Sequence, residues 1–134
     1  MEKQTISNIA AILKKDKNIT LAYVFGSAAK KPMPRYKDID VAVLLNKELR
    51  GLKKLEFIDH ISTSLKKKAG CPVDVVILNS APPALRQQVL KYGILLFERA
   101  KGLSNKMMVD TITAYLDYLD ILNFFHSKTI KKRS

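Results

Sequence analysis

Several residue types are scarce in this chain, and each scarcity narrows the classes of protein that it fits. The 134 residues include no tryptophan and a single cysteine, Cys71. A lone cysteine excludes an intramolecular disulfide and is typical of a reducing compartment, and we interpret Cys71 as a small core residue. No apolar run approaches the roughly 20 residues that cross a bilayer, and residues 1–15 lack the apolar core of a signal peptide. We therefore expect a cytoplasmic protein without a membrane segment.

Acidic residues are also scarce, since 12 Asp and Glu stand against 24 Lys and Arg, which gives a net charge of +12. Such a charge attracts polyanions, among them nucleotides, RNA and acidic protein surfaces. The lysines form short runs scattered along the chain, which favours solvated helix faces over a nucleic-acid-binding arm. Few aromatic residues and no RNA-binding motif disfavour direct nucleic-acid binding.

Hydrophobic residues make up 47% of the chain, enough for the core of one domain over residues 1–134. Apolar residues at helical spacing alternate with β-branched runs, which predicts an α/β (α+β) protein with a mixed sheet flanked by helices. Within a core of about residues 1–100, we expect helices over 5–15, within 47–68 and over 82–92, and strands over 19–25, 38–45, 73–78 and 94–98. A C-terminal helix capped by Ser104 is expected over 104–127, before a frayed basic tail over 128–134.

The pattern Asp38-Ile39-Asp40 opens the second expected strand. Alternation along a strand places Asp38 and Asp40 on the same face. Two adjacent carboxylates need a cation, and oxygen ligands without nearby His or Cys suit Mg²⁺, which binds through one or two carboxylates plus substrate phosphates. The pair therefore predicts a magnesium site that takes a nucleoside triphosphate.

Gly26 and Ser27 follow the first expected strand and precede a helix start. Glycine permits a sharp turn and a close backbone approach, while free N–H groups and the Ser27 hydroxyl are donors for phosphate. Lys30 adds positive charge nearby. We assign these three residues to nucleotide binding.

Asp74 interrupts an otherwise apolar strand. Such a carboxylate is usually a solvent-exposed strand end, but it can also be held beside a charge. If its strand neighbours that of Asp40, it joins the first two carboxylates and can accept a proton from an attacking hydroxyl.

The combination Gly26-Ser27, ten residues, Asp38-x-Asp40 and a later strand aspartate resembles the signature of the DNA polymerase β nucleotidyltransferase superfamily, and most closely the minimal nucleotidyltransferases of the MNT or MntA type. The resemblance implies a polymerase-β-like core in which Gly26 and Ser27 hold the triphosphate. It implies that Asp38 and Asp40 bind two Mg²⁺ ions, and that Asp74 binds metal and activates the acceptor. The family often has Arg where this chain has Lys30.

The same resemblance implies a function and a partner. Many minimal nucleotidyltransferases are antitoxins that add AMP from ATP to a tyrosine of a HEPN ribonuclease toxin, in a type VII toxin–antitoxin pair. Two alternatives stay open: an antitoxin that neutralises its toxin by binding alone, and an enzyme that modifies a small molecule such as an aminoglycoside. A chain this short leaves no room for a substrate domain, which favours a protein acceptor.

The expected C-terminal helix is apolar on more than one side, because Val109, Ile121, Phe124 and Phe125 lie off its main stripe. Such a helix often packs against more than its own core. A partner protein, a homo-oligomer formed through this helix, and packing across the domain are all compatible with the pattern.

Overall fold

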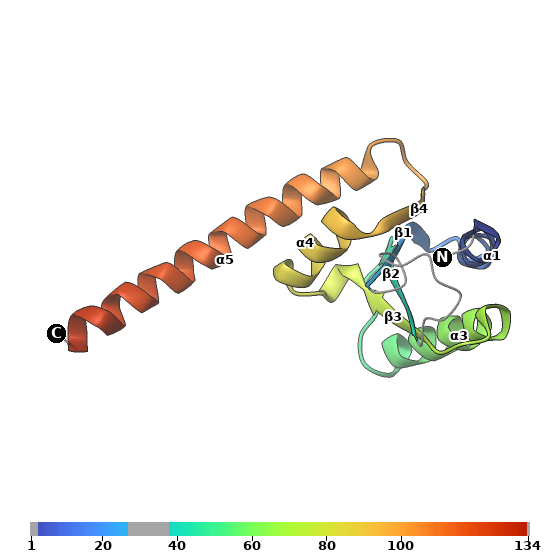
Figure 1. The fold of residues 1–134 in the computed structure, drawn as a ribbon, viewed down its shortest axis with the longest axis horizontal. Helices are drawn as coiled ribbons and strands as arrows, with labels where there is room; N and C mark the ends of the chain where they lie inside the picture. Colours follow the sequence, from blue (N-terminus) through green and yellow to red (C-terminus); the bar gives the residue numbers. More distant parts are fainter. Residues whose placement is uncertain (1–2, 27–37, 134) are drawn as a thin grey trace.

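A mixed four-stranded sheet forms the centre of the molecule (Figure 1). The computed structural model describes residues 3–26 and 38–133, with the side chains of 129–133 left aside. The strands are β1 (Ile19–Phe25), β2 (Ile39–Leu45), β3 (Val73–Ile77) and β4 (Ile94–Glu98), in the order β3-β2-β1-β4. β2 and β3 are parallel, whereas β1 is antiparallel to both of its neighbours. The predicted mixed sheet is confirmed.

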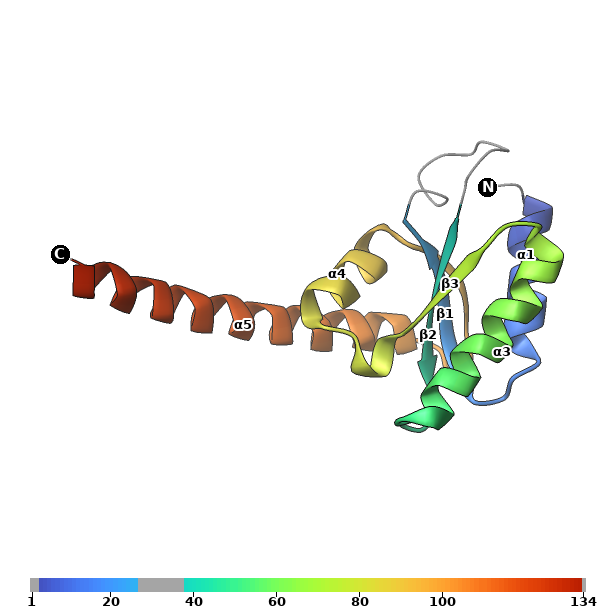
Figure 2. The ribbon, with the colours of Figure 1, turned by 90° about the horizontal axis from the view of Figure 1, so that it is seen from below.

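Two pairs of helices cover the two faces of the sheet (Figure 2). On one face, α1 (Lys3–Lys14) and α3 (Leu52–Ala69) pack against strand residues such as Ala22 and Val24. On the other face, α4 (Pro83–Tyr92) and α5 (Leu103–Arg133) pack against the intervening residues, including Leu21 and Tyr23. Because successive side chains of a strand point to opposite faces, β1 supplies both halves of the core.

Local sequence signals account for the end of α3 and the start of α4. α3 ends at Gly70, which adopts a left-handed conformation with φ 72°. α4 begins at Pro83, where the missing N–H of proline has no helical partner to lose.

The third strand ends one residue earlier than predicted, because a short 3-10 helix, η1 (Leu78–Ser80), follows it. Within η1, the side chain of Asn79 accepts a hydrogen bond from the Leu45 N–H and donates one to the Leu45 carbonyl, both at 2.8 Å. This contact ties the turn to the end of β2, and nothing in the local sequence indicated it.

The C-terminal helix differs from the prediction at both ends. It begins at Leu103 and continues to Arg133, so it includes most of the segment expected as a frayed tail. Basic residues favour the C-terminal end of a helix dipole, which is consistent with the longer helix. Ser104 does not act as the predicted cap. Instead, the Glu98 carboxylate accepts hydrogen bonds from the N–H groups of Gly102 at 3.1 Å and Ser104 at 2.9 Å.

Beyond α4, the helix α5 projects away from the rest of the molecule (Figures 1 and 2). Across the described part of the chain, no helix is both long and apolar enough to cross a bilayer.

Candidate active site

Asp40 lies where three strands meet at one edge of the sheet. It is the second residue of β2, paired with Phe25 at the end of β1 and with Asp74 near the start of β3. Because β2 and β3 run in parallel, the side chains of the aligned Asp40 and Asp74 share a face. Asp38 precedes β2 by one residue and has the same parity as Asp40. The fold therefore brings the three predicted carboxylates to one edge.

The same end of the sheet is closed by a backbone contact between β2 and the start of β3. The Ile39 N–H donates a hydrogen bond to the Pro72 carbonyl at 3.1 Å. This bond sets the register that aligns Asp40 with Asp74, so the conditional prediction that their strands are neighbours is confirmed.

Gly26 ends β1 directly against the carboxylate of Asp40. Its φ is +77°, in the left-handed region that L side chains rarely adopt. A β-carbon added at Gly26 would overlap the Oδ2 atom of Asp40. The sequence predicted a close backbone approach at this glycine, and among the described residues the group that it approaches is a carboxylate.

The charges at this edge repel one another. Asp40 is half-buried, whereas Asp38 and Asp74 are exposed. Burial raises the pKa of Asp40, and the neighbouring charges of Asp74 and Asp38 raise it further. Since a raised pKa means that the ionised form is disfavoured, the edge holds negative charge that the fold itself does not stabilise.

No group among the described residues neutralises these three carboxylates. No hydrogen bond or ion pair within residues 3–26 and 38–128 reaches the side chains of Asp38, Asp40 or Asp74. Carboxylate oxygens are the ligands that magnesium prefers, so this set of donors fits a divalent cation. Among the described residues, no group of three or more His, Cys, Asp or Glu side chains is arranged so that it could hold a metal ion by itself. That finding suits an ion that takes its remaining ligands from substrate phosphates.

Two of the predicted nucleotide-binding residues, Ser27 and Lys30, fall between the described ranges, as does the loop expected over 30–37. The structure therefore places Gly26, Asp38, Asp40 and Asp74 together and leaves the other two as predictions.

Cys71 lies close to Asp38, one of the three carboxylates, which the sequence analysis did not predict. It packs against the core on the α1 and α3 side, as its interpretation as a core residue implied. Burial raises the pKa of its thiol, and the charge of Asp38 raises it further. Only the parallel pairing of β2 with β3 brings it close to Asp38, so no local pattern in the sequence could have indicated the contact.

Comparison with known proteins gives consistent results at the level of sequence. Residues 7–102 match the family described as "Polymerase beta, Nucleotidyltransferase". The protein adenylyltransferase MntA of Shewanella oneidensis is 35% identical over 75 residues, which are 56% of this chain and 51% of MntA. The chain thus spans about half the length of this curated relative.

Solved structures extend the likeness to the fold. A tri-AMPylated Shewanella oneidensis HEPN toxin in complex with MNT antitoxin contains a chain that is 26% identical, with a TM-score of 0.75 over 97% of this chain and 99% of that one. A toxin–antitoxin structure with AMP-PNP gives 25% identity and a TM-score of 0.74 over the same shares. The structure of the MntA–HepT toxin–antitoxin, 23% identical over 96% of this chain and 99% of that one, also has a TM-score of 0.75. The predicted polymerase-β-like fold with a C-terminal helix is confirmed.

The family match covers well over half of the chain, and it includes the sheet edge at which Gly26, Asp38, Asp40 and Asp74 meet. The chain belongs to the polymerase β nucleotidyltransferase family.

Proposed function

We propose that this protein is a magnesium-dependent adenylyltransferase that transfers AMP from ATP to a tyrosine hydroxyl of a HEPN-type toxin, and thereby acts as the antitoxin of a toxin–antitoxin pair. The observation that carries the proposal is the alignment of Asp40 with Asp74, beside Asp38, with no neutralising group among the described residues. Three such carboxylates are what a nucleotidyl transfer site needs to hold magnesium and a triphosphate.

The relatives support the identity of the nucleotide and of the acceptor. MntA is named a protein adenylyltransferase, and one similar structure contains AMP-PNP, a compound that resembles ATP. Another contains a tri-AMPylated HEPN toxin beside MNT antitoxin. Because the likeness in fold extends over 97% of this chain, a protein acceptor of the same class is the most economical proposal.

In this proposal, the residues at the sheet edge divide into metal ligands and phosphate-binding groups. Asp38 and Asp40, together with Asp74, would hold two magnesium ions, which would supply charge stabilisation at the α-phosphate. Gly26, Ser27 and Lys30 hold the triphosphate. Only Gly26 of these three lies in a described range, and there its backbone N–H would be its donor to phosphate.

The transfer step conserves atoms and charge. The tyrosine oxygen attacks the α-phosphorus, and its proton passes to the carboxylate of Asp74. The new bond joins the tyrosine oxygen to the α-phosphorus, while the bond between that phosphorus and the bridging oxygen of the β-phosphate breaks. Pyrophosphate leaves with the electron pair of the broken bond. Asp74 suits the role of base because it is exposed at the edge, where an incoming protein can reach it.

The proposal is tested by incubating the purified chain with a HEPN toxin, magnesium and labelled ATP, and by following the transfer of label. The native chain should label the HEPN protein, and a variant with Asp38→Asn and Asp40→Asn should not. Asp59→Asn is the matched control, because Asp59 is an exposed aspartate of α3 and should leave labelling unchanged. Mass spectrometry of the labelled protein should place AMP on a tyrosine.

The alternative from a different functional class is an antitoxin that neutralises its toxin by binding alone, without an enzymatic reaction. It would be supported if the Asp38→Asn, Asp40→Asn variant bound the toxin and abolished its ribonuclease activity as well as the native chain does. Transfer of label to an aminoglycoside, with none to the HEPN protein, would instead support the small-molecule enzyme.

A further inference from the structure

Helix α5 exposes more large apolar side chains than any other described element. Val109 is 63% exposed and Phe125 is 60% exposed, and six further large apolar side chains of this helix are similarly open to solvent. These are Ile112, Leu116, Tyr118, Ile121, Leu122 and Phe124. Large exposed apolar side chains in such number mark interaction surfaces.

Part of this surface continues the stripe by which α5 packs on its own domain. Thr111 is fully buried at the start of the stripe, where α5 lies against α4. The stripe then runs through Tyr115, Tyr118, Leu122 and Phe125 in alternating steps of four and three residues. That spacing is the heptad pattern of a helix packed along a second helix. Beyond α4, the pattern persists but no other described element covers it (Figure 1).

The charges beside this stripe are arranged for an antiparallel neighbour of the same sequence. Asp117 and Lys128 are 11 residues apart, about three helical turns, so they lie on the same flank of α5. They also lie at nearly equal distances on either side of Leu122. If a second α5 crosses at Leu122 in the opposite direction, Asp117 of each copy faces Lys128 of the other.

Neither of these two residues has an opposite charge to pair with inside the molecule. Among the described residues, neither Asp117 nor Lys128 takes part in an ion pair, and Lys128 lies instead over the ring of Phe124 at 4.6 Å from the centroid. The antiparallel arrangement also places Tyr118 opposite Phe125 of the second copy, which pairs two exposed aromatic side chains.

We propose that the projecting part of α5, residues 115–128, associates with that of a second copy of this chain, as an antiparallel helix pair centred on Leu122. The seam is formed by Tyr118, Ile121, Leu122 and Phe125, with Asp117 and Lys128 as its flanking ion pairs. An interface of this kind is isologous and closes as a two-fold dimer.

The area involved sets the strength of the dimer. The four seam side chains are 45–60% exposed and together offer apolar surface on the order of ~400 Å² per copy. With a polar rim added, the total area buried by the two copies falls at the low end of specific interfaces, which begin near ~1,200 Å² in total. The dimer should therefore be reversible and dependent on concentration.

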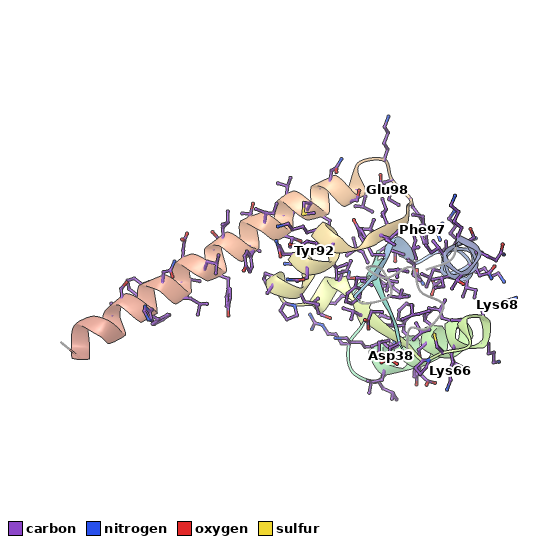
Figure 3. The ribbon with its side chains drawn as sticks, viewed as in Figure 1. Asp38, Lys66, Lys68, Tyr92, Phe97 and Glu98 are labelled. Carbon is purple, nitrogen blue, oxygen red and sulfur yellow. The ribbon has the colours of Figure 1, made fainter. Side chains whose placement is uncertain are left out.

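The proposed interface leaves the nucleotide site open. Asp38 lies on the opposite side of the molecule from the projecting end of α5 (Figure 3). Dimerisation would hold two sites apart, and each would stay accessible to its own acceptor. The inference is independent of the proposed function, because it needs neither nucleotide nor toxin.

The test measures the mass of the purified chain alone, by sedimentation or light scattering, over a wide range of protein concentration. The native chain should pass from monomer to dimer. Leu122→Asp should be monomeric throughout, with an unchanged circular dichroism spectrum showing that it is folded. Asp117→Lys and Lys128→Asp should each raise the dissociation constant by roughly tenfold, since each replaces two attractive pairs with repulsive ones.

A charge swap makes the test specific for the antiparallel register. The double variant Asp117→Lys, Lys128→Asp should restore the native dissociation constant, whereas Asp120→Lys, on a different flank of α5, should leave it unchanged. A chain that stays monomeric at every concentration overturns the proposal. A dimer that the double swap fails to restore overturns it as well. A face that becomes covered only when the HEPN protein is added would assign this surface to the toxin.

Discussion

The carboxylate edge of the sheet and the projecting part of α5 both lack interactions within the described residues, but of opposite kinds. At the sheet edge, Asp38, Asp40 and Asp74 gather charge that nothing described neutralises. On α5, apolar side chains gather that nothing described covers. The first deficit suits a small cation and phosphates, as we propose for the nucleotide, whereas the second suits the surface of another protein chain. The proposed site of chemistry and the proposed surface of assembly therefore lie on opposite sides of the core (Figure 3).

The largest expected effect comes from removing charge at the sheet edge. Asp40→Asn should lower AMP transfer by about a thousandfold or more, because a metal ligand is lost. The same change should raise the melting temperature of the nucleotide-free protein, since it removes a half-buried carboxylate that repels its neighbours. Both expectations are checked on one preparation, by an assay of AMP transfer and by calorimetry of the melting temperature. A variant that is inactive and also less stable would contradict the repulsion described at this edge.

Gly26→Ala should have the next largest effect, because the new β-carbon would displace the Asp40 carboxylate. We expect AMP transfer to fall by roughly tenfold to a hundredfold, as when catalytic groups shift by about 1 Å. Gly51→Ala is the matched control, since Gly51 also has a positive φ, +59°, but open space around it. Both variants should lose about 1 kcal/mol of stability to backbone strain, but only Gly26→Ala should lose activity. Equal activities would show that the contact with Asp40 is unimportant.

The pH dependence of magnesium binding sharpens the electrostatic side of the comparison. Because the pKa of Asp40 is raised, its carboxyl takes up a proton at a higher pH than an ordinary aspartate. As the pH falls through that raised pKa, the protonated carboxyl relieves the repulsion in the metal-free protein and weakens its affinity for magnesium. As the pH is lowered, the rise in melting temperature caused by magnesium should therefore be lost at a pH higher than ~3.9, the ordinary pKa of aspartate. A loss confined to more acidic solution would contradict this picture.

The smallest expected effect lies at the start of α5. Hydrogen bonds from the Ser104 side chain and from the N–H groups of Ser104 and Gly102 hold the pKa of Glu98 below its usual range. Their stabilisation is present above the pKa of the unfolded chain and is lost as the pH falls through the lowered folded pKa. Glu98→Gln should lower the free energy of unfolding at neutral pH, as measured by urea denaturation. Glu56→Gln, on the exposed face of α3, should change it little.

The sequence predicts well those elements that depend on short stretches of neighbouring residues. The β-branched run of β1 and the Pro83 and Gly70 signals gave the strand and helix ends within a few residues. The meeting of Asp40 with Asp74 depended on which strands are neighbours, and the sequence could state it only as a condition. The register of β2 with β3 meets that condition.

Contacts between distant segments were beyond the reach of these patterns. The cap of α5 was assigned to Ser104 because serine is a common capping residue, but the group that caps the helix is Glu98, from the preceding strand. In the same way, the side chain of Asn79 binds the backbone of Leu45 across 34 positions of sequence. Such bonds depend on the tertiary fold, which no window of neighbouring residues contains.

The anchoring of α5 by Glu98 has a consequence for the geometry of an assembly. Since the bonds to Gly102 and Ser104 fix where the helix leaves the sheet, its length would set the distance between the proposed nucleotide site and a second copy bound at the far end. Each turn added to or removed from α5 would move that end by about 5.4 Å. Helix length alone would then tune how far apart two active sites are held, without altering either of them.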